Sequence, residues 1–204
     1  MNRAIFLVAI LAIGTFVSIA GKKLHSENYT IDNSKSSLEW FATKVTGKHN
    51  GTINFSNGTI ANTHGSLMGS FEIDMNSIVN TDIKDQKSKA KLEKHLKSED
   101  FFNVAVYPKA RFVITTVKPL SSPNSSGATH QIIGNLTIKD KTNEISFDAL
   151  ILMEADKMLC TGSAVIDRSK FDVRYGSKTF FENIGDKMIH DEFTLKFSVV
   201  AVKG

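Results

Sequence analysis

The sequence contains one cysteine, three prolines and 13 glycines among 204 residues, and its formal net charge is only +4. One cysteine excludes an internal disulfide framework and a zinc cluster held by thiolates. The low proline and glycine contents exclude a fibrous chain, and 41% hydrophobic with 23% charged residues excludes a disordered one. The mildly basic charge does not call for nucleic acid as a partner. A globular chain remains, with a length that fits a single domain.

The first twenty residues have the pattern of a targeting segment. Arg3 supplies a positive charge, residues 4–13 form an unbroken apolar run, and Ala20 ends a small-residue cleavage site. This pattern predicts a signal peptide over residues 1–20, cleaved after Ala20, and export to a bacterial periplasm. The alternative is an uncleaved membrane anchor. The mature domain is then residues 21–204.

Beyond the leader, apolar and polar residues alternate with a period of two, which is typical of strands with one buried face. The segments with this alternation, or with many β-branched and aromatic residues, are 38–45, 52–55, 67–75, 111–117, 131–139, 145–153, 158–166 and 193–201. Turn residues at Asn50-Gly51, Asn57-Gly58, 121–127 and 140–143 are expected to separate strands. Many strands with few helices predict an all-β barrel or sandwich with one short helix.

The helix is expected within residues 82–100, which lack alternation, glycine and proline. Six lysines fall in this segment against five acidic residues. The basic face suggests contact with a membrane surface or anionic head groups. The interspersed acids favour the alternative, a helix whose charges are simply solvated.

Closing such strands into a barrel leaves an interior that is either filled by side chains or holds one small ligand. Glycines in register with large apolar residues suggest space for a long apolar molecule, whereas glycines that relieve strain in a curved sheet suggest a solid core. Periodicity alone leaves both open. The candidate lining residues are Phe71, Ile73, Leu136, Phe147, Phe193 and Phe197, with Gly69 and Gly134 as the small positions.

Motifs of catalysis and metal binding are missing from the sequence. It has no nucleophile elbow, phosphate-binding glycine loop, HExxH or paired cysteines, and its histidines lack metal-ligand spacing. Cys160 is expected to pack as a small apolar residue. The polar cluster in residues 166–192 is either a ring of head-group contacts at a barrel mouth or an irregular connection held by salt bridges. Its members are Arg168, Arg174, Tyr175, Lys178, His190 and Glu192.

Several motifs in order resemble the YceI-like family over residues 29–202. They are YTID at 29–32, KHNG at 48–51, FSNG at 55–58, HLKSEDFFN at 95–103, GNLTI at 134–138 and DRSKFDV at 167–173. The resemblance implies an exported, lipocalin-like, extended antiparallel eight-stranded barrel with an internal apolar tunnel. One departure is Asp172, where many members of the family carry glycine.

The resemblance also implies a function: binding of a polyisoprenoid or another long-chain amphiphile, with no catalysis, no cofactor and no metal. It places Arg168 and His49 near the polar end of the tunnel, with Tyr175 and His190 as further mouth candidates. Transient membrane contact and a homodimer are compatible with this interpretation. Two alternatives stay open: a structural or stress-protective barrel without a ligand, and an enzyme that uses His49, His190, Glu192 or Tyr175 for proton transfer.

Overall fold

A computed structural model describes residues 26–204. The predicted signal peptide, residues 1–20, lies outside the described residues. The helix is α1 (Gln86–Lys97). The strands are β1 (Ser26–Ile31), β2 (Ser37–Lys44), β3 (Gly47–Thr63), β4 (Ser66–Asn80), β5 (Lys109–Pro119), β6 (His130–Ile138), β7 (Lys141–Met153), β8 (Lys157–Asp167) and β9 (Ile189–Lys203).

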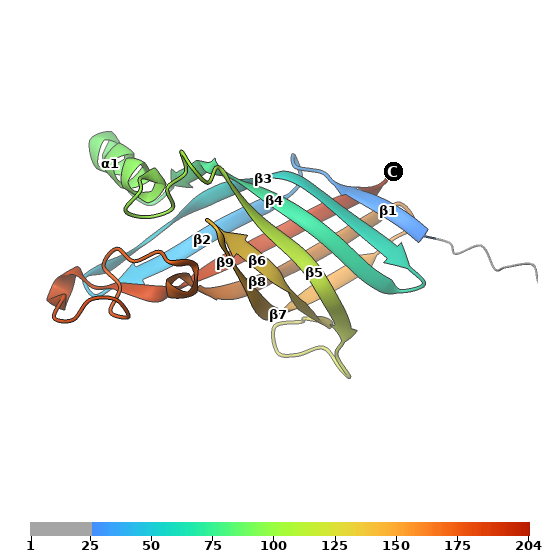
Figure 1. The fold of residues 1–204 in the computed structure, drawn as a ribbon. Coiled ribbons are helices and arrows are strands. Elements are labelled where there is room, and N and C mark those ends of the chain that lie inside the picture. Colours follow the sequence, from blue (N-terminus) through green and yellow to red (C-terminus); the bar gives the residue numbers. More distant parts are fainter. Residues whose placement is uncertain (1–25) are drawn as a thin grey trace, which may run out of the picture.

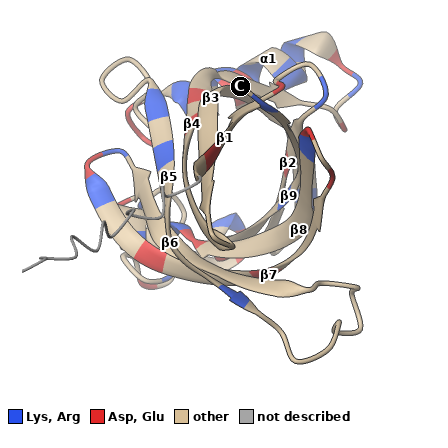
Figure 2. Cartoon of the chain, turned by 90° about the vertical axis from the view of Figure 1, so that its right-hand side faces the viewer, with Lys and Arg blue, Asp and Glu red and all other residues tan. Residues whose placement is uncertain are grey.

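The strands form one closed antiparallel barrel (Figures 1 and 2). β4 pairs with β3 as well as with β5, and this pairing closes the sheet. β1 and β2 both lie between β3 and β9, one after the other, so together they fill a single strand position. Nine strands therefore occupy eight positions, which confirms the predicted eight-stranded antiparallel barrel with one helix.

The predicted alternation matches the two faces of the strands. In β4, the buried side chains include Leu67, Phe71, Ile73 and Met75, while Met68 is half exposed on the outer face. β6 buries every second residue from Ile132 onward. The period is informative because successive Cβ atoms point to opposite sides of a strand, so one face forms the barrel interior.

Two of the predicted turns are wrong. Asn50-Gly51 and Asn57-Gly58 both lie inside β3, the longest strand. A Cβ at Gly58 would lie 2.8 Å from side-chain atoms of both Ile31 and Phe71. Glycine stands there because neighbouring side chains come too close for a Cβ atom, and not because the chain turns. Residues 121–127 lie in the β5–β6 connection, as predicted. The turn predicted at residues 140–143 is correct only for Asp140, because β7 already begins at Lys141.

Helix α1 lies at the end of the barrel away from the C-terminus (Figure 1). The Asp85 side chain caps its start by accepting a hydrogen bond from the Ser88 N–H at 2.8 Å. The backbone N–H of Asn80, at the end of β4, donates to the Glu93 carboxylate at 2.8 Å and so fixes α1 to the barrel. No residue of α1 is fully buried.

The connection between β8 and β9 lies at the same end as α1 (Figure 1). It begins with a 3-10 turn over Arg168–Phe171, which ends at Asp172 in the left-handed region, with φ of 57°. Glycine adopts this conformation without strain and aspartate is among the few other residues that tolerate it. The backbone conformation at position 172 therefore suits either aspartate or glycine.

Candidate functional site

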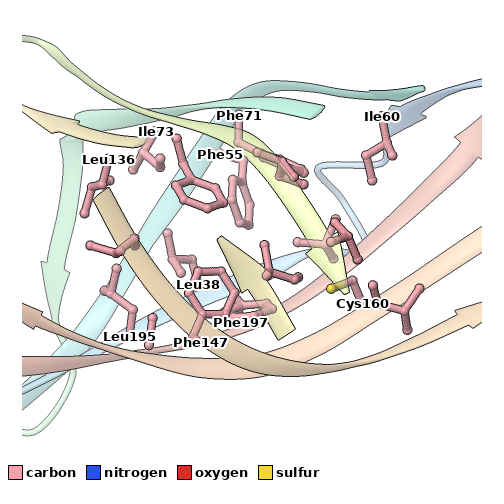
Figure 3. A pocket seen from close by; sticks show the side chains of 18 of the residues that line it. Leu38, Phe55, Ile60, Phe71, Ile73, Leu136, Phe147, Cys160, Leu195 and Phe197 are labelled. Atoms are coloured by element: carbon pink, nitrogen blue, oxygen red, sulfur yellow. The ribbon is translucent and has the colours of Figure 1, made fainter. Parts of the chain in front are cut away.

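The barrel interior contains an apolar cavity, cavity A, with a volume of about 110 Å³. Five phenylalanines contribute to its wall, together with aliphatic side chains and Cys160. The phenylalanines are Phe55, Phe71, Phe112, Phe147 and Phe197. In Figure 3 the rings of Phe55 and Phe71 enter from one side and those of Phe147 and Phe197 from the other, and no labelled side chain carries nitrogen or oxygen. Such a wall offers burial to a hydrocarbon and no polar contact.

The aromatic rings of cavity A form a connected series along the wall. The Phe147 ring lies 5.6 Å from that of Phe112 and 5.4 Å from that of Phe197, between ring centres. These spacings and tilted orientations are the ones that aromatic pairs favour. The rings of Phe112, Phe147 and Phe197 thus pack against one another along the wall of cavity A.

A second apolar cavity, cavity B, lies at the α1 end of the interior and also measures about 110 Å³. Trp40, Phe101, Phe102 and Phe193 belong to its lining, as does Leu96 from α1. Four aliphatic side chains line both cavities, so the cavities adjoin at these residues, here called the waist. The waist residues are Leu38, Ile73, Leu136 and Leu195.

The predicted lining residues divide between the cavities. Phe71, Phe147 and Phe197 line cavity A, Phe193 lines cavity B, and Ile73 and Leu136 belong to the waist.

Gly69 and Gly134 line neither cavity. A Cβ at Gly134 would lie 2.5 Å from the Phe112 ring, and one at Gly69 would lie 3.2 Å from Ile114. Neighbouring side chains therefore cover both glycines.

Arg168 is buried, with only 2% of its surface exposed. Its guanidinium donates to four backbone carbonyls, those of Val173, Tyr175, Ile189 and His190, at 2.8–3.2 Å. It also forms an ion pair with the Asp191 carboxylate at 3.1 Å. Burial lowers the pKa of Arg168 and the nearby Asp191 opposes this shift, but an arginine in this setting stays charged. These contacts use all three guanidinium nitrogens and hold the two ends of the β8–β9 connection together.

The other predicted mouth residues are distributed around the α1 end. His49 Nδ1 lies 2.9 Å from the Asp82 carboxylate. The Tyr175 ring is half exposed and packs edge-on against the His95 ring, 4.4 Å between ring centres. His190 is exposed, although it contributes to the lining of cavity B. Between residues 26 and 204, no hydrogen bond joins the side chains of His49, Tyr175 and His190 to one another.

A small apolar pocket under α1 adjoins cavity B and shares Trp40, Ala42, Leu96, Phe101 and Ile189 with it. Its remaining lining includes Lys44, Lys48, His49 and His95. The α1 end of the interior is thus bordered by basic side chains, whereas cavity A is apolar throughout.

A family model for the YceI-like domain matches residues 29–201. The chain belongs to the YceI-like family. Among curated relatives, a UPF0312 protein of Pseudomonas putida is 30% identical over 146 residues, which is 69% of this chain and 70% of the relative. A UPF0312 protein of Pectobacterium carotovorum is 34% identical over 82 residues. That match spans only 39% of the relative's length.

Two solved structures share the YceI-like barrel. BcnA of Burkholderia cenocepacia has a TM-score of 0.66 at 22% identity, covering 84% of this chain and 99% of that one. A polyisoprenoid binding domain from Saccharophagus degradans has a TM-score of 0.59 at 14% identity, covering 86% and 98%. At such identities the likeness concerns the fold.

Several lining residues of this YceI-like chain are not predicted from its sequence. Trp40 and Leu38 are expected only as part of a strand, although their spacing with Ala42 places all three on one face. Phe101 and Phe102 follow α1 and have no period to reveal them. Asp191, the ionic partner of Arg168, was also missed, because the pair is separated by the whole β8–β9 connection.

Within residues 26–204, no group of three or more histidine, cysteine, aspartate or glutamate side chains is arranged to hold a metal ion. The same residues contain no helix that is long and apolar enough to span a membrane.

Proposed function

We propose that this YceI-like barrel binds a long-chain apolar lipid, a polyisoprenoid or a similar amphiphile, with the hydrocarbon chain inside the barrel. The observation that carries the proposal is the pair of adjoining apolar cavities along the barrel interior. Phe71, Phe147 and Phe197 would contact the chain in cavity A, Ile73 and Leu136 at the waist, and Phe193 in cavity B. The likeness in fold to a polyisoprenoid binding domain supports the same class of ligand.

The energetics favour a hydrocarbon over any polar ligand in this interior. Each buried methylene contributes about 0.8 kcal/mol, so a chain of a dozen carbons suffices for strong binding. Each cavity, at about 110 Å³, is somewhat smaller than an engineered apolar cavity of about 150 Å³ that accepts benzene. A long chain would therefore occupy both cavities and pass between the waist side chains.

The proposal assigns Arg168 a role in shaping the site. Because its nitrogens face protein carbonyls and Asp191, the guanidinium would position the β8–β9 connection beside cavity B without pairing with a ligand head group. Export to the periplasm after removal of residues 1–20, and carriage of the lipid there, complete the proposal.

Catalysis receives less support than binding. An enzyme would need His49, His190, Glu192 or Tyr175 to converge on a reacting atom. Instead His49 pairs with Asp82 and the Tyr175 ring packs against His95. Binding without turnover is accordingly the function proposed.

The decisive experiment is extraction of lipid from the full chain purified from its native host, followed by mass spectrometry and reloading of the delipidated protein with farnesol. We expect an extracted long-chain lipid and a rise in melting temperature on reloading, because a ligand at about 100 times its Kd stabilises the folded state by about 2.7 kcal/mol. A protein that is repeatedly empty and whose melting temperature does not respond would refute the proposal.

A pair of variants on β8 makes the test specific for the interior. Ala164 is buried and lines cavity A, whereas Val165, the next residue, is 60% exposed on the outer face. Ala164→Phe is expected to fill the cavity and abolish the farnesol response. Val165→Phe adds a similar volume outside the barrel and should leave the response unchanged.

A further inference from the structure

The outer side of α1 carries a row of lysines. Lys87, Lys91 and Lys94 are exposed, and because they are spaced four and three residues apart they lie on one face of the helix. These three residues are here called the lysine face. None of them forms an ion pair with another residue between positions 26 and 204. Their charges are therefore available to an anionic surface.

The acidic residues of this segment do not lie on the lysine face. Glu93, the one acid within α1, accepts the hydrogen bond of the Asn80 N–H and so lies on the side toward the barrel. Asp85 caps the start of the helix, and the Asp82 carboxylate lies 2.9 Å from His49. Acids and lysines are interspersed in the sequence, but positive charge predominates on the outer side of the folded helix.

The connection between β8 and β9 exposes aromatic side chains at the same end of the barrel. Among residues 26–204, the exposed aromatic side chains are Tyr175, Phe180 and Phe181, which are between 37% and 50% exposed. Phe180 and Phe181 are here called the aromatic tip. The backbone N–H groups of both tip residues donate to the carbonyl of Ser177, a completely buried residue. The fold itself therefore holds the two rings at the surface.

Basic side chains lie beside the aromatic tip. The guanidinium of Arg174 lies over the Phe180 ring, 5.1 Å from its centre, and Lys178 is exposed. Aromatic rings next to basic side chains are typical of protein surfaces at the head-group level of a membrane. The connection also exposes Glu182 and Asp186. Its contribution to membrane contact is therefore apolar, whereas α1 supplies the charge.

The lysine face and the aromatic tip belong to one end of the molecule (Figure 1). The Tyr175 ring packs against His95 of α1, with 4.4 Å between ring centres. A surface hollow of about 540 Å³ is lined by both elements, with Glu99 and Asp100 from the end of α1 and Phe181 from the tip. These two acids thus line the hollow. A flat, extended partner could contact both elements at once.

The opposite end of the barrel offers no such combination. The β5–β6 connection, residues 120–129, contains no charged residue. Leu152 and Met153 are half exposed at the end of β7, but the turn that follows, residues 154–156, contains two acids and no base. An anionic surface would repel this turn. Charge and exposed apolar surface together favour the α1 end.

We propose that the α1 end of the barrel docks on a membrane surface that contains anionic phospholipids. The lysine face contacts the lipid phosphates, and the aromatic tip inserts between the head groups. Cavity B, which lies at the α1 end, then faces the bilayer. Docking does not require a lipid inside the barrel, but it brings the barrel interior next to a source of lipid.

The test is sedimentation of the full chain, produced in its native host, with lipid vesicles of two compositions. One set contains phosphatidylcholine alone and the other contains phosphatidylcholine with phosphatidylglycerol. We expect binding to the anionic vesicles that weakens as salt is added, because salt screens exposed charges, and much weaker binding to the neutral vesicles. Equal binding to both compositions would overturn the proposal.

Variants of the lysine face identify the surface that docks. Replacing Lys87, Lys91 and Lys94 together by glutamine should weaken binding to the anionic vesicles about a hundredfold, since each lysine near such a surface contributes about fivefold. The control removes the same charge from three exposed lysines away from the α1 end, which should change binding far less. The control residues are Lys35, Lys118 and Lys157.

The aromatic tip is tested by Phe180→Ser together with Phe181→Ser. This double variant should bind the anionic vesicles at least about tenfold more weakly. Its salt dependence should stay the same, because salt does not screen an apolar contact. Leu152→Ser with Met153→Ser removes apolar side chains of similar exposure from the opposite end and should leave binding unchanged.

The outcomes separate docking from the proposed function. Equal binding by the lysine-face variant and its lysine control would show that the α1 end is not the docking surface. Full binding by the variant of the aromatic tip would refute its insertion. The response of the unaltered chain to farnesol reports on the barrel interior alone, so its absence refutes lipid binding in the barrel and leaves docking standing.

Discussion

The ring of Phe112 on β5 lies over Gly134 on β6, so closely that a Cβ at position 134 would come within 2.5 Å of the ring carbon Cζ. The carbonyl oxygen of Val113 would be equally close. An aromatic ring on the neighbouring strand thus occupies the volume that the glycine leaves. Cavities A and B therefore do not lie at Gly134. They lie where side chains from opposite walls of the barrel do not contact one another.

Gly134→Ala is therefore expected to destabilise the protein by about 1–3 kcal/mol, as overpacking of a fitted core does. The backbone oxygen of Val113 cannot rotate away, so the strands themselves must shift. Urea unfolding measures the change. Gly47→Ala is the matched control, because its Cβ would meet only Lys44 Cε at 3.9 Å. Equal stability of both variants would contradict the packing described for Phe112.

The sequence predicts the barrel well because burial on one face of a strand imposes a period of two. That period identified the inner residues of β4 and β6. The turns predicted at Asn50-Gly51 and Asn57-Gly58 are wrong, because the same dipeptides that form turns also occur in strands where side chains of neighbouring strands need space. The local sequence does not show which residue of a neighbouring strand will lie close to the glycine.

The site was less predictable than the fold for a related reason. Whether two inward residues touch across the interior depends on barrel curvature, which no local pattern records. The sequence of the polar cluster at residues 166–192 is compatible with a ligand mouth and with a braced connection, and the contacts of Arg168 favour the second. Those contacts join residues distant in sequence, so they emerge only in the folded chain.

Arg168→Met should destabilise the protein by about 3–5 kcal/mol, because Asp191 and several carbonyls would lose their partner while buried. Arg168→Lys should restore only part of the loss, since an ammonium cannot reach all of these acceptors. Thermal unfolding and limited proteolysis between β8 and β9 measure the effect. Arg174→Lys, at an exposed ion pair with Asp172, should change stability by less than about 0.5 kcal/mol. A tolerated Arg168→Met would refute the bracing role.

Asp82 should contribute an acid-sensitive part of the stability. Burial of its carboxyl group would raise its pKa, but hydrogen bonds from the Asn50 N–H, His49 and Asn80 hold the pKa below its ordinary value of 3.8. A lowered pKa means that the stabilisation is complete above the unfolded value and is lost as the pH falls through the folded one.

Asp82→Asn is therefore expected to flatten the fall in melting temperature below about pH 4. Scanning calorimetry across an acid series measures this slope. Asp186→Asn, which removes an exposed acid from the β8–β9 connection, controls for the loss of one negative charge. An acid slope that Asp82→Asn leaves unchanged would show that its hydrogen bonds do not stabilise the folded state.

Cys160 reports on access to cavity A, because it lines the cavity and burial raises the pKa of its thiol to about 12. A thiol of this kind is almost entirely protonated near pH 8 and hardly reacts. We expect iodoacetamide to label the folded chain very slowly, more slowly still with farnesol bound, and rapidly in urea, with one adduct counted by mass spectrometry.

The control for Cys160 moves the thiol to the outer face in the double variant Cys160→Ala with Val165→Cys. This variant should be labelled quickly by iodoacetamide in the folded state, and added farnesol should not change the labelling rate. Labelling of Cys160 as fast in the folded chain as in urea would mean that the interior is open to solvent.

The waist should set the chain length that the barrel accepts. Leu136, contributed by β6, is 5% exposed and lines both cavities. Leu136→Ala would join the cavities at a cost of about 2–5 kcal/mol in stability. Affinities for geraniol and geranylgeraniol, a short and a long isoprenoid alcohol, measure the consequence. The preference for the long alcohol should rise at least about fourfold, the equivalent of one more buried methylene.

Leu136→Phe should narrow the waist and shift the preference toward geraniol. Leu152→Ala shortens a leucine that is half exposed at the barrel surface and should leave the preference unchanged. Because the two changes at position 136 act in opposite directions on the passage, a general loss of stability cannot imitate both. If neither variant alters the ratio of affinities, the long chain does not cross the waist, and the two cavities bind ligands separately.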